Sequence, residues 1–184
     1  MILARFRKDP QRDAGRALYG RAAEQSRRPE FYTGFGVADT VDGRFELLAL
    51  HVFLTLKRLS AEPEARRISQ AVVDRFFEAL DDSLREMGVG DLSVGKRIRG
   101  MAEAFYGRSA AYDAALAGGA PEGALGEALA RNVYGSHDAA HAGALAAYVR
   151  ASIAALAAEP ASRVLSGCLA FPIPAPGGVY VEAV

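Results

Sequence analysis

The chain has 184 residues and a mass of 19.5 kDa, which suffices for one compact domain and is short for two. Hydrophobic residues make up 51% and charged residues 24% of the chain, a composition typical of a folded globular protein. Basic and acidic residues both number 22, and this balance argues against a general DNA- or RNA-binding function. The single cysteine, Cys168, excludes an internal disulfide and a cysteine-based zinc site.

The N-terminal segment differs from the rest of the chain in charge. Residues 1–29 hold eight basic side chains against three acidic ones, so this segment is positive and the remainder is negative. We interpret residues 1–17 as a basic arm, in which Arg5, Arg7 and Lys8 are candidates for contact with RNA or anionic lipid. Residues 1–6 lack the apolar stretch of a signal peptide, and the apolar run over 45–56 is too short to cross a bilayer. We therefore expect a cytoplasmic protein.

The first half of the chain predicts helices joined by one long loop. Apolar residues recur at helical spacing along almost the whole sequence, which predicts an all-α fold, a single bundle-like domain of about six helices. The first helix is expected over 14–27, because the residue before Pro29 avoids the helical region. Residues 28–42 contain three aromatic residues and predict a long ordered loop.

Five helices are expected to follow the loop. The pattern predicts helices over 43–59 and 63–87, the second ending at Gly88, and a further helix with Ser93 as its N-cap that ends before Gly118. Two alanine-rich helices are expected over 121–134 and 138–158. The helical domain thus extends from about residue 18 to 168, and the prolines and glycines of 169–184 predict an extended tail.

Motifs for catalysis or metal binding are weak in this sequence. His137 and His141 are four residues apart, but the glutamate base and a third ligand of a zinc helix are missing, so we predict no metal site. The glycines of residues 88–95 are better explained by a helix cap and a turn than by a nucleotide loop. No nucleophile elbow or phosphate-binding loop is present, and we expect neither catalytic residues nor a cofactor.

Polar residues gather instead around two segments. Asp39, Asp42 and Arg44 lie in or just after the aromatic loop, and the second group is Asp81, Asp82, Arg85, Glu86 and Asp91. If the two segments meet, buried pairs of aspartate and arginine would join them. His51 lies on an apolar helix face and is interpreted as a core histidine with satisfied hydrogen bonds. The aromatic residues of the loop either fill the core or border a binding groove.

Several strings in the first two thirds of the chain carry a family resemblance. They are Leu18-Tyr19, residues 29–32 (PEFY), residues 36–47 (GVADTVDGRFEL), Leu50-His51, residues 84–91 (LREMGVGD) and residues 105–108 (FYGR). In this order and spacing, they resemble the ubiquinol–cytochrome c chaperone family over about residues 18–116. Mitochondrial members of that family are assembly factors for respiratory complex III.

The resemblance implies a non-enzymatic assembly chaperone for the cytochrome bc complex in a bacterium. It would bind newly made cytochrome b through a groove bordered by residues 29–44 and 84–95. The family-typical patch consists of Tyr32, Asp39, Arg44, His51, Arg85, Glu86, Asp91 and Arg108. Lys96, Arg97 and Arg99 are further candidates for contact with ribosomal RNA or anionic lipid, which would give the protein a peripheral place at the ribosome or the inner membrane.

Two alternative functions stay open at this point. One is a carrier of haem or a quinone in which His51 serves as an axial ligand. The other is an adaptor for a different protein client.

Overall fold

The computed structural model describes residues 9–136 and 140–177 and is all-helical in that part. Its elements in chain order are α1 (Pro10–Ser26), α2 (Glu30–Thr33), α3 (Val41–Leu59), the 3-10 turn η1 (Pro63–Ala65), α4 (Arg66–Glu86), α5 (Asp91–Leu116), α6 (Ala124–Val133), α7 (Ala142–Ala158) and α8 (Ala161–Leu165). Six helices of the described ranges have ten residues or more, which confirms the predicted all-α domain. The long loop after α1 is ordered, and it contains the short helix α2.

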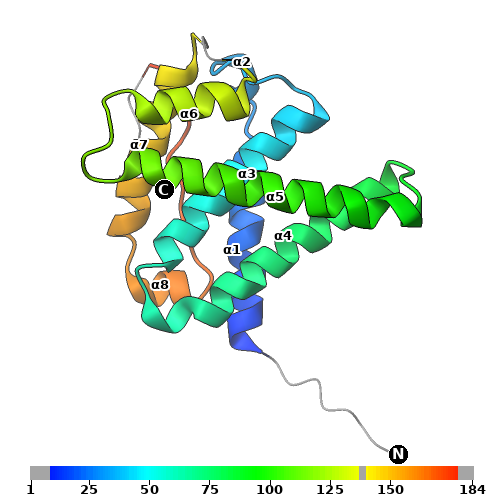
Figure 1. The fold of residues 1–184 in the computed structure, drawn as a ribbon. Helices are drawn as coiled ribbons and strands as arrows, with labels where there is room; N and C mark the ends of the chain where they lie inside the picture. The colour runs from blue at the N-terminus through cyan, green and yellow to red at the C-terminus, as the bar shows by residue number, and fades with distance from the viewer. Residues whose placement is uncertain (1–8, 137–139, 178–184) are drawn as a thin grey trace, which may run out of the picture.

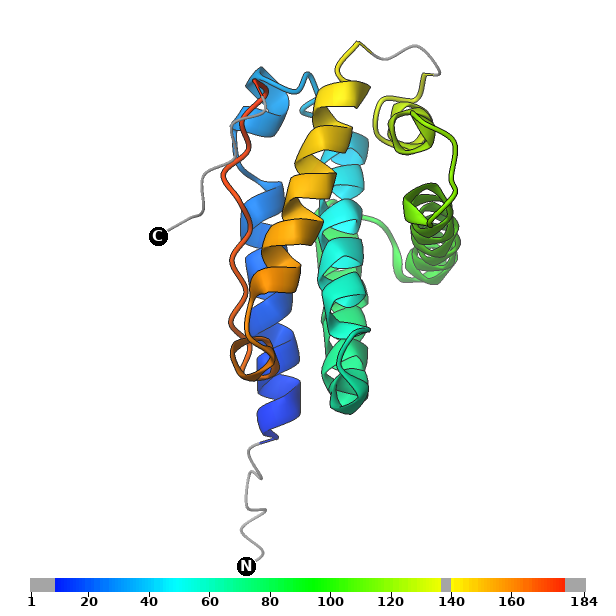
Figure 2. The ribbon, with the colours of Figure 1, turned by 90° about the vertical axis from the view of Figure 1, so that its left-hand side faces the viewer.

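The helices form an elongated bundle with two helices on one side. Helices α1, α3, α4 and α7 run in a similar direction in Figure 2, but Figure 1 shows α3 and α4 oblique to α1 and α7, with α5 and α6 lying across them. Within the bundle, α1 contacts both α4 and α3. At the crossing of α1 and α4, a Cβ on Gly15 would lie 2.5 Å from Ala71 Cβ and 2.8 Å from Ile68 O. Only glycine therefore permits this close approach.

Three helices begin earlier than the sequence predicts, because capping residues extend them. Helix α1 starts at Pro10, where the Asp9 carboxylate accepts a hydrogen bond from Arg12 N at 3.3 Å. Residues 10–17 are thus helical. Helix α3 starts at Val41, because the Thr40 hydroxyl accepts from Gly43 N at 3.1 Å.

Helix α5 starts at Asp91, so the predicted N-cap at Ser93 is wrong. Gly90 takes the extended N-cap conformation, and the Asp91 carboxylate lies in the first turn. There it complements the positive end of the helix dipole. The end of α4 follows the prediction, since Gly88 adopts a positive φ of 80° just after it.

The C-terminal strap, residues 169–177, is extended and packs into the bundle. It returns from α8 past α1 and α7 towards α2 (Figure 2). Leu169 and Phe171 are buried, and the carbonyl of Pro172 accepts a hydrogen bond from Gln25 Nε2 at 2.8 Å. Pro176 lies against Gly34, where a Cβ would come within 2.5 Å of its ring. The strap thus covers one side of the hydrophobic core.

Across residues 9–136 and 140–177, no helix is both long enough and apolar enough to span a lipid bilayer.

Candidate functional site

An apolar groove of about 270 Å³ opens where α1, α2, α3, α4 and α5 come together. Its described lining residues are Ser26, Arg27, Tyr32, Val41, Arg44, Phe45, Leu48, Leu80, Ser83, Leu84, Met87 and Met101. Val41 is 60% and Met87 is 52% exposed, which is unusual for large apolar side chains. Val41 lies at the start of α3 and Met87 at the end of α4, so both walls of the groove expose apolar surface to solvent.

Two helical stripes build the apolar walls. Val41, Phe45 and Leu48 recur at spacings of four and three on α3, so they share one helix face. Leu80, Leu84 and Met87 repeat the same spacing on α4. Beneath them, the Phe45 ring stacks on the buried Phe76 at 6.4 Å between centroids, which anchors the groove to the core.

The rim of the groove is basic. Arg44 Nε donates to Asp39 Oδ1 at 2.6 Å, and this hydrogen bond lowers the pKa of the exposed Asp39 carboxyl. Arg27 forms no ion pair with a residue in the described ranges. The Tyr32 hydroxyl donates to Ser26 O at 3.1 Å, and burial raises the pKa of Tyr32. Among the groove's described lining residues, the charged side chains are those of Arg27 and Arg44.

The second polar segment lies next to the groove but does not join the first. Arg85 donates to Asp81 Oδ2 at 2.5 Å and also to Asp91, and all three side chains are at least one third exposed. Asp39 pairs with Arg44 at the other segment. The predicted buried aspartate–arginine pairs between the segments are therefore wrong, because each arginine finds an acid a few residues away in its own exposed segment. Glu86 is exposed and lines a polar hollow that shares Arg27 and Ser83 with the groove.

Arg108 forms a partly buried ion pair beside the groove residue Phe45. Its Nε and Nη2 each donate to one oxygen of Glu46 at 2.5 Å, and its guanidinium lies 5.8 Å from the Phe45 ring centroid. The Glu46 side chain is only 8% exposed. Burial raises the pKa of Glu46, and the hydrogen bonds of Arg108 oppose that shift. Sequence reasoning missed Glu46, although an acid inside the apolar run of α3 indicates a buried partner.

His51 lies in the core, away from the groove. Its Nδ1 contacts Leu47 O at 2.7 Å, and a carbonyl can only accept, so Nδ1 carries the proton. Nε2 then accepts from the Tyr148 hydroxyl at 2.9 Å, and that oxygen accepts from Gln25 Nε2 at 3.0 Å. Full burial lowers the pKa of His51 to about 4. Tyr148 was missed because only the tertiary fold brings α7 to α3.

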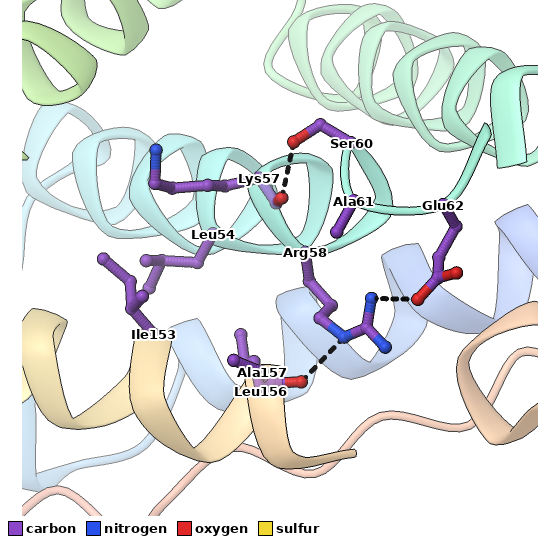
Figure 3. A pocket seen from close by; sticks show the side chains of 9 residues that line it. All are labelled: Leu54, Lys57, Arg58, Ser60, Ala61, Glu62, Ile153, Leu156 and Ala157. Carbon is purple, nitrogen blue, oxygen red and sulfur yellow. Dashed lines mark hydrogen bonds and ion pairs between the residues drawn. The ribbon is translucent and has the colours of Figure 1, made fainter. Parts of the chain in front are cut away.

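A second hollow, of about 420 Å³, lies between the ends of α3 and α7. Figure 3 shows the Arg58 side chain extending from α3 towards Leu156 and Glu62. Its Nε donates to Leu156 O at 2.8 Å, its Nη2 to Glu159 O at 2.9 Å and its Nη1 to Glu62 at 2.7 Å. Arg58 therefore caps the carbonyls of α7. Because Lys57 is paired with Asp113 as well, the charges of this hollow are already used within the protein.

The remaining candidate residues lie apart from the groove or outside the described part of the chain. Lys96, Arg97 and Arg99 are exposed on α5. Arg5, Arg7, Lys8 and His137 lie outside the described residues. His141 precedes α7, and its ring packs on Gly36, where a Cβ would lie 2.5 Å from His141 Cδ2. His141 thus has a packing role in the structure.

Comparison with known proteins agrees with this architecture. The chain matches the family model described as ubiquinol-cytochrome C chaperone over residues 33–171. It is 26% identical over 97 residues to ubiquinol-cytochrome-c reductase complex assembly factor 1 of Xenopus laevis, a match covering 52% of this chain and 48% of that relative. The match thus spans about half the length of this curated relative.

A solved structure extends the comparison to the whole fold. The crystal structure of the Cbp3 homolog from Brucella abortus superposes with a TM-score of 0.77 at 36% identity, over 87% of this chain and 89% of that one. The residues matched by the family model, 33–171, include both apolar walls of the groove and the strap as far as Phe171. The chain therefore belongs to the ubiquinol–cytochrome c chaperone family.

Proposed function

We propose that this protein is an assembly chaperone for the cytochrome bc complex and that its groove holds an apolar segment of newly made cytochrome b. The observation that carries the proposal is the open apolar groove between α3 and α4, with exposed Val41 and Met87 and an arginine on its rim. Such a surface can hold an apolar segment reversibly, while Arg27 or Arg44 fixes its orientation through polar contacts. The proposed task involves no covalent step.

The burial and hydrogen bonds of His51 argue against the alternative function of a haem carrier. Both ring nitrogens are engaged, one with Leu47 O and one with the Tyr148 hydroxyl, and the ring is fully buried. An axial ligand needs a free ring nitrogen facing a cavity. Haem binding at His51 would therefore break the hydrogen-bond network of Gln25, Tyr148 and the strap.

The test is complementation of a strain that lacks the gene, with two groove variants. Val41→Asp places an acid in the first turn of α3, and Met87→Lys places a cation at the end of α4, so the helix dipoles favour both charges. Both charges disrupt the apolar groove. We expect membranes from these strains to lose the b-type and c-type signals of the bc complex in reduced-minus-oxidised absorbance spectra, together with immunodetected cytochrome b.

The matched controls are Ile173→Asp and Ile173→Lys. Ile173 is 36% exposed on the strap and does not line the groove. These controls should restore the spectra as the wild type does. Full restoration by the groove variants would reject the groove as the client site, whereas normal spectra in the deletion strain would reject the assembly function itself.

A further inference from the structure

The turn between α4 and α5 projects from the molecule and carries exposed apolar side chains. Figure 1 shows the two helices converging on this turn at the edge of the fold, beyond the other helices. Leu92, in the first turn of α5, is 101% exposed, and Met87 at the end of α4 is 52% exposed. Gly88 and Gly90 lie between them, with open space where a Cβ would be. The tip can therefore touch a flat surface without interference from the bundle.

Free positive charges follow directly behind the tip. Lys96 and Arg99 lie four and seven residues after Leu92, so all three share one face of α5, and Arg97 is adjacent. All three basic residues are exposed, and none forms an ion pair with a residue in the described part of the chain.

The acids near the tip are paired only in part, since Asp81 and Asp91 share the single Arg85. Asp82 lies 3.6 Å from Arg75. Glu86 is exposed on α4, and Glu103 follows one turn beyond Arg99 on α5. The first turns of α5 thus present three unpaired cations behind an apolar tip, and Glu86 and Glu103 are the nearby acids that have no ion pair in the described ranges.

We infer that the α4–α5 tip docks on the surface of an anionic lipid bilayer, with Leu92 inserted at the interface and the three cations against lipid phosphates. An anionic bilayer has charged headgroups above an apolar acyl-chain region. The free cations can bind the headgroups, and the adjacent apolar side chain can enter the acyl-chain region. RNA phosphates could bind the three cations equally well, but RNA backbone contacts would not use the exposed Leu92 side chain. Met87 belongs to both the tip and the groove, so docking would place the groove at the membrane surface.

The experiment is flotation of the full-length protein with phosphatidylcholine vesicles that contain or lack phosphatidylglycerol. We expect binding to the anionic vesicles only, falling as salt rises. The triple variant Lys96→Gln, Arg97→Gln, Arg99→Gln should weaken it about a hundredfold, from a roughly fivefold loss per cation. Leu92→Ser should also weaken binding, without affecting the melting temperature, because the side chain is fully exposed.

Two control variants separate the tip from general positive charge. The variant Arg66→Gln, Arg131→Gln, Arg150→Gln removes the same charge from exposed arginines that have no ion pair in the described ranges. It should bind as the wild type does. The variant Arg5→Gln, Arg7→Gln, Lys8→Gln removes the three basic residues of positions 1–8 and should also retain most of the binding.

A fluorescence readout reports insertion directly. The chain contains no tryptophan, so Leu92→Trp introduces a single reporter at the tip. Its emission should shift to shorter wavelength with anionic vesicles, while Tyr106→Trp, further along α5, should not shift. The inference is overturned if binding is lost equally in the control triple variant, or only in the N-terminal one. It is also overturned if Leu92→Ser floats with the anionic vesicles as well as the wild type does, because the leucine would then not insert into the bilayer.

Discussion

Glu46 and His51 lie five residues apart on α3, and the fold stabilises these two buried polar side chains in different ways. Glu46 has a guanidinium partner, Arg108, that donates two hydrogen bonds to it. His51 has only neutral partners, Leu47 O and the Tyr148 hydroxyl, so its neutral form is the one that the core accepts. Of the family-typical patch, Arg108 and His51 therefore hold the fold together, whereas Tyr32 and Arg44 face the groove.

The His51 site predicts acid sensitivity. Its pKa is lowered from 6.5 to about 4 in the folded protein, so the unfolded chain binds the extra proton between these values. The free energy of unfolding should therefore fall as the pH falls, by about 2 kcal/mol between pH 7 and pH 5. Urea denaturation at the two pH values measures it. His51→Gln should remove most of this pH dependence, and His141→Gln, which leaves the His51 network intact, should retain it.

Glycines in two helices show how differently the same residue type is used. Gly43 lies in the first turn of α3, where an added Cβ would meet Ala38 O at 2.0 Å. Gly107 lies in α5 on an exposed face, with nothing within 4 Å of an added Cβ. The first glycine lets the chain turn sharply into the helix that forms one wall of the groove. The second has no steric role within the protein.

Replacement by alanine should change stability in opposite directions at these positions. Gly43→Ala should lower the free energy of unfolding by about 2 kcal/mol or more, because the backbone at Ala38 must move. Gly107→Ala should raise it by roughly 0.5–1 kcal/mol, since alanine loses less conformational entropy in a helix. Chemical denaturation of both variants gives the answer, and a similar change in the two would contradict the steric explanation.

The helices could be predicted from the sequence more completely than their ends or their contacts. Apolar spacing is a local property, and it located all six long helices. The starts at Pro10, Val41 and Asp91 were missed by two to four residues, because each depends on a cap at Asp9, Thr40 or Gly90. The resemblance pointed to Tyr32 and Arg44. The pairing of Glu46 with Arg108 and of His51 with Tyr148 needs the tertiary fold, which spacing does not contain.

At the scale of the whole molecule, the C-terminal strap ties distant parts of the chain together. Phe171 packs edge-on against the His51 ring at 5.3 Å between centroids, and Gln25 binds both Tyr148 and the strap carbonyl of Pro172. The strap thus joins α1, α3 and α7 at one point. Through Pro176 it also supports α2, the helix that carries Tyr32 to the groove.

Loss of the strap's aromatic anchor should therefore be costly. Phe171→Ala should lower the free energy of unfolding by about 3 kcal/mol, because it leaves a cavity beside His51. Ile173→Ala, two residues further on the exposed side of the strap, should cost less than about 0.5 kcal/mol. Thermal melting of the two variants compares them directly, and equal melting temperatures would show that the strap does not contribute to the core.

The strap also sets the order in which the protein can mature. Gln25 and Pro172 are separated by 147 positions, and a ribosome makes the chain in the order in which it is numbered. Gln25 on α1 lacks its Pro172 partner until the strap has been synthesised, although α3 and α4, which also contact α1, are made earlier. The core around His51 therefore closes after translation of residue 172, and the mature groove follows, because α2 is supported by the same strap. The mature groove is therefore complete only after the strap has been synthesised.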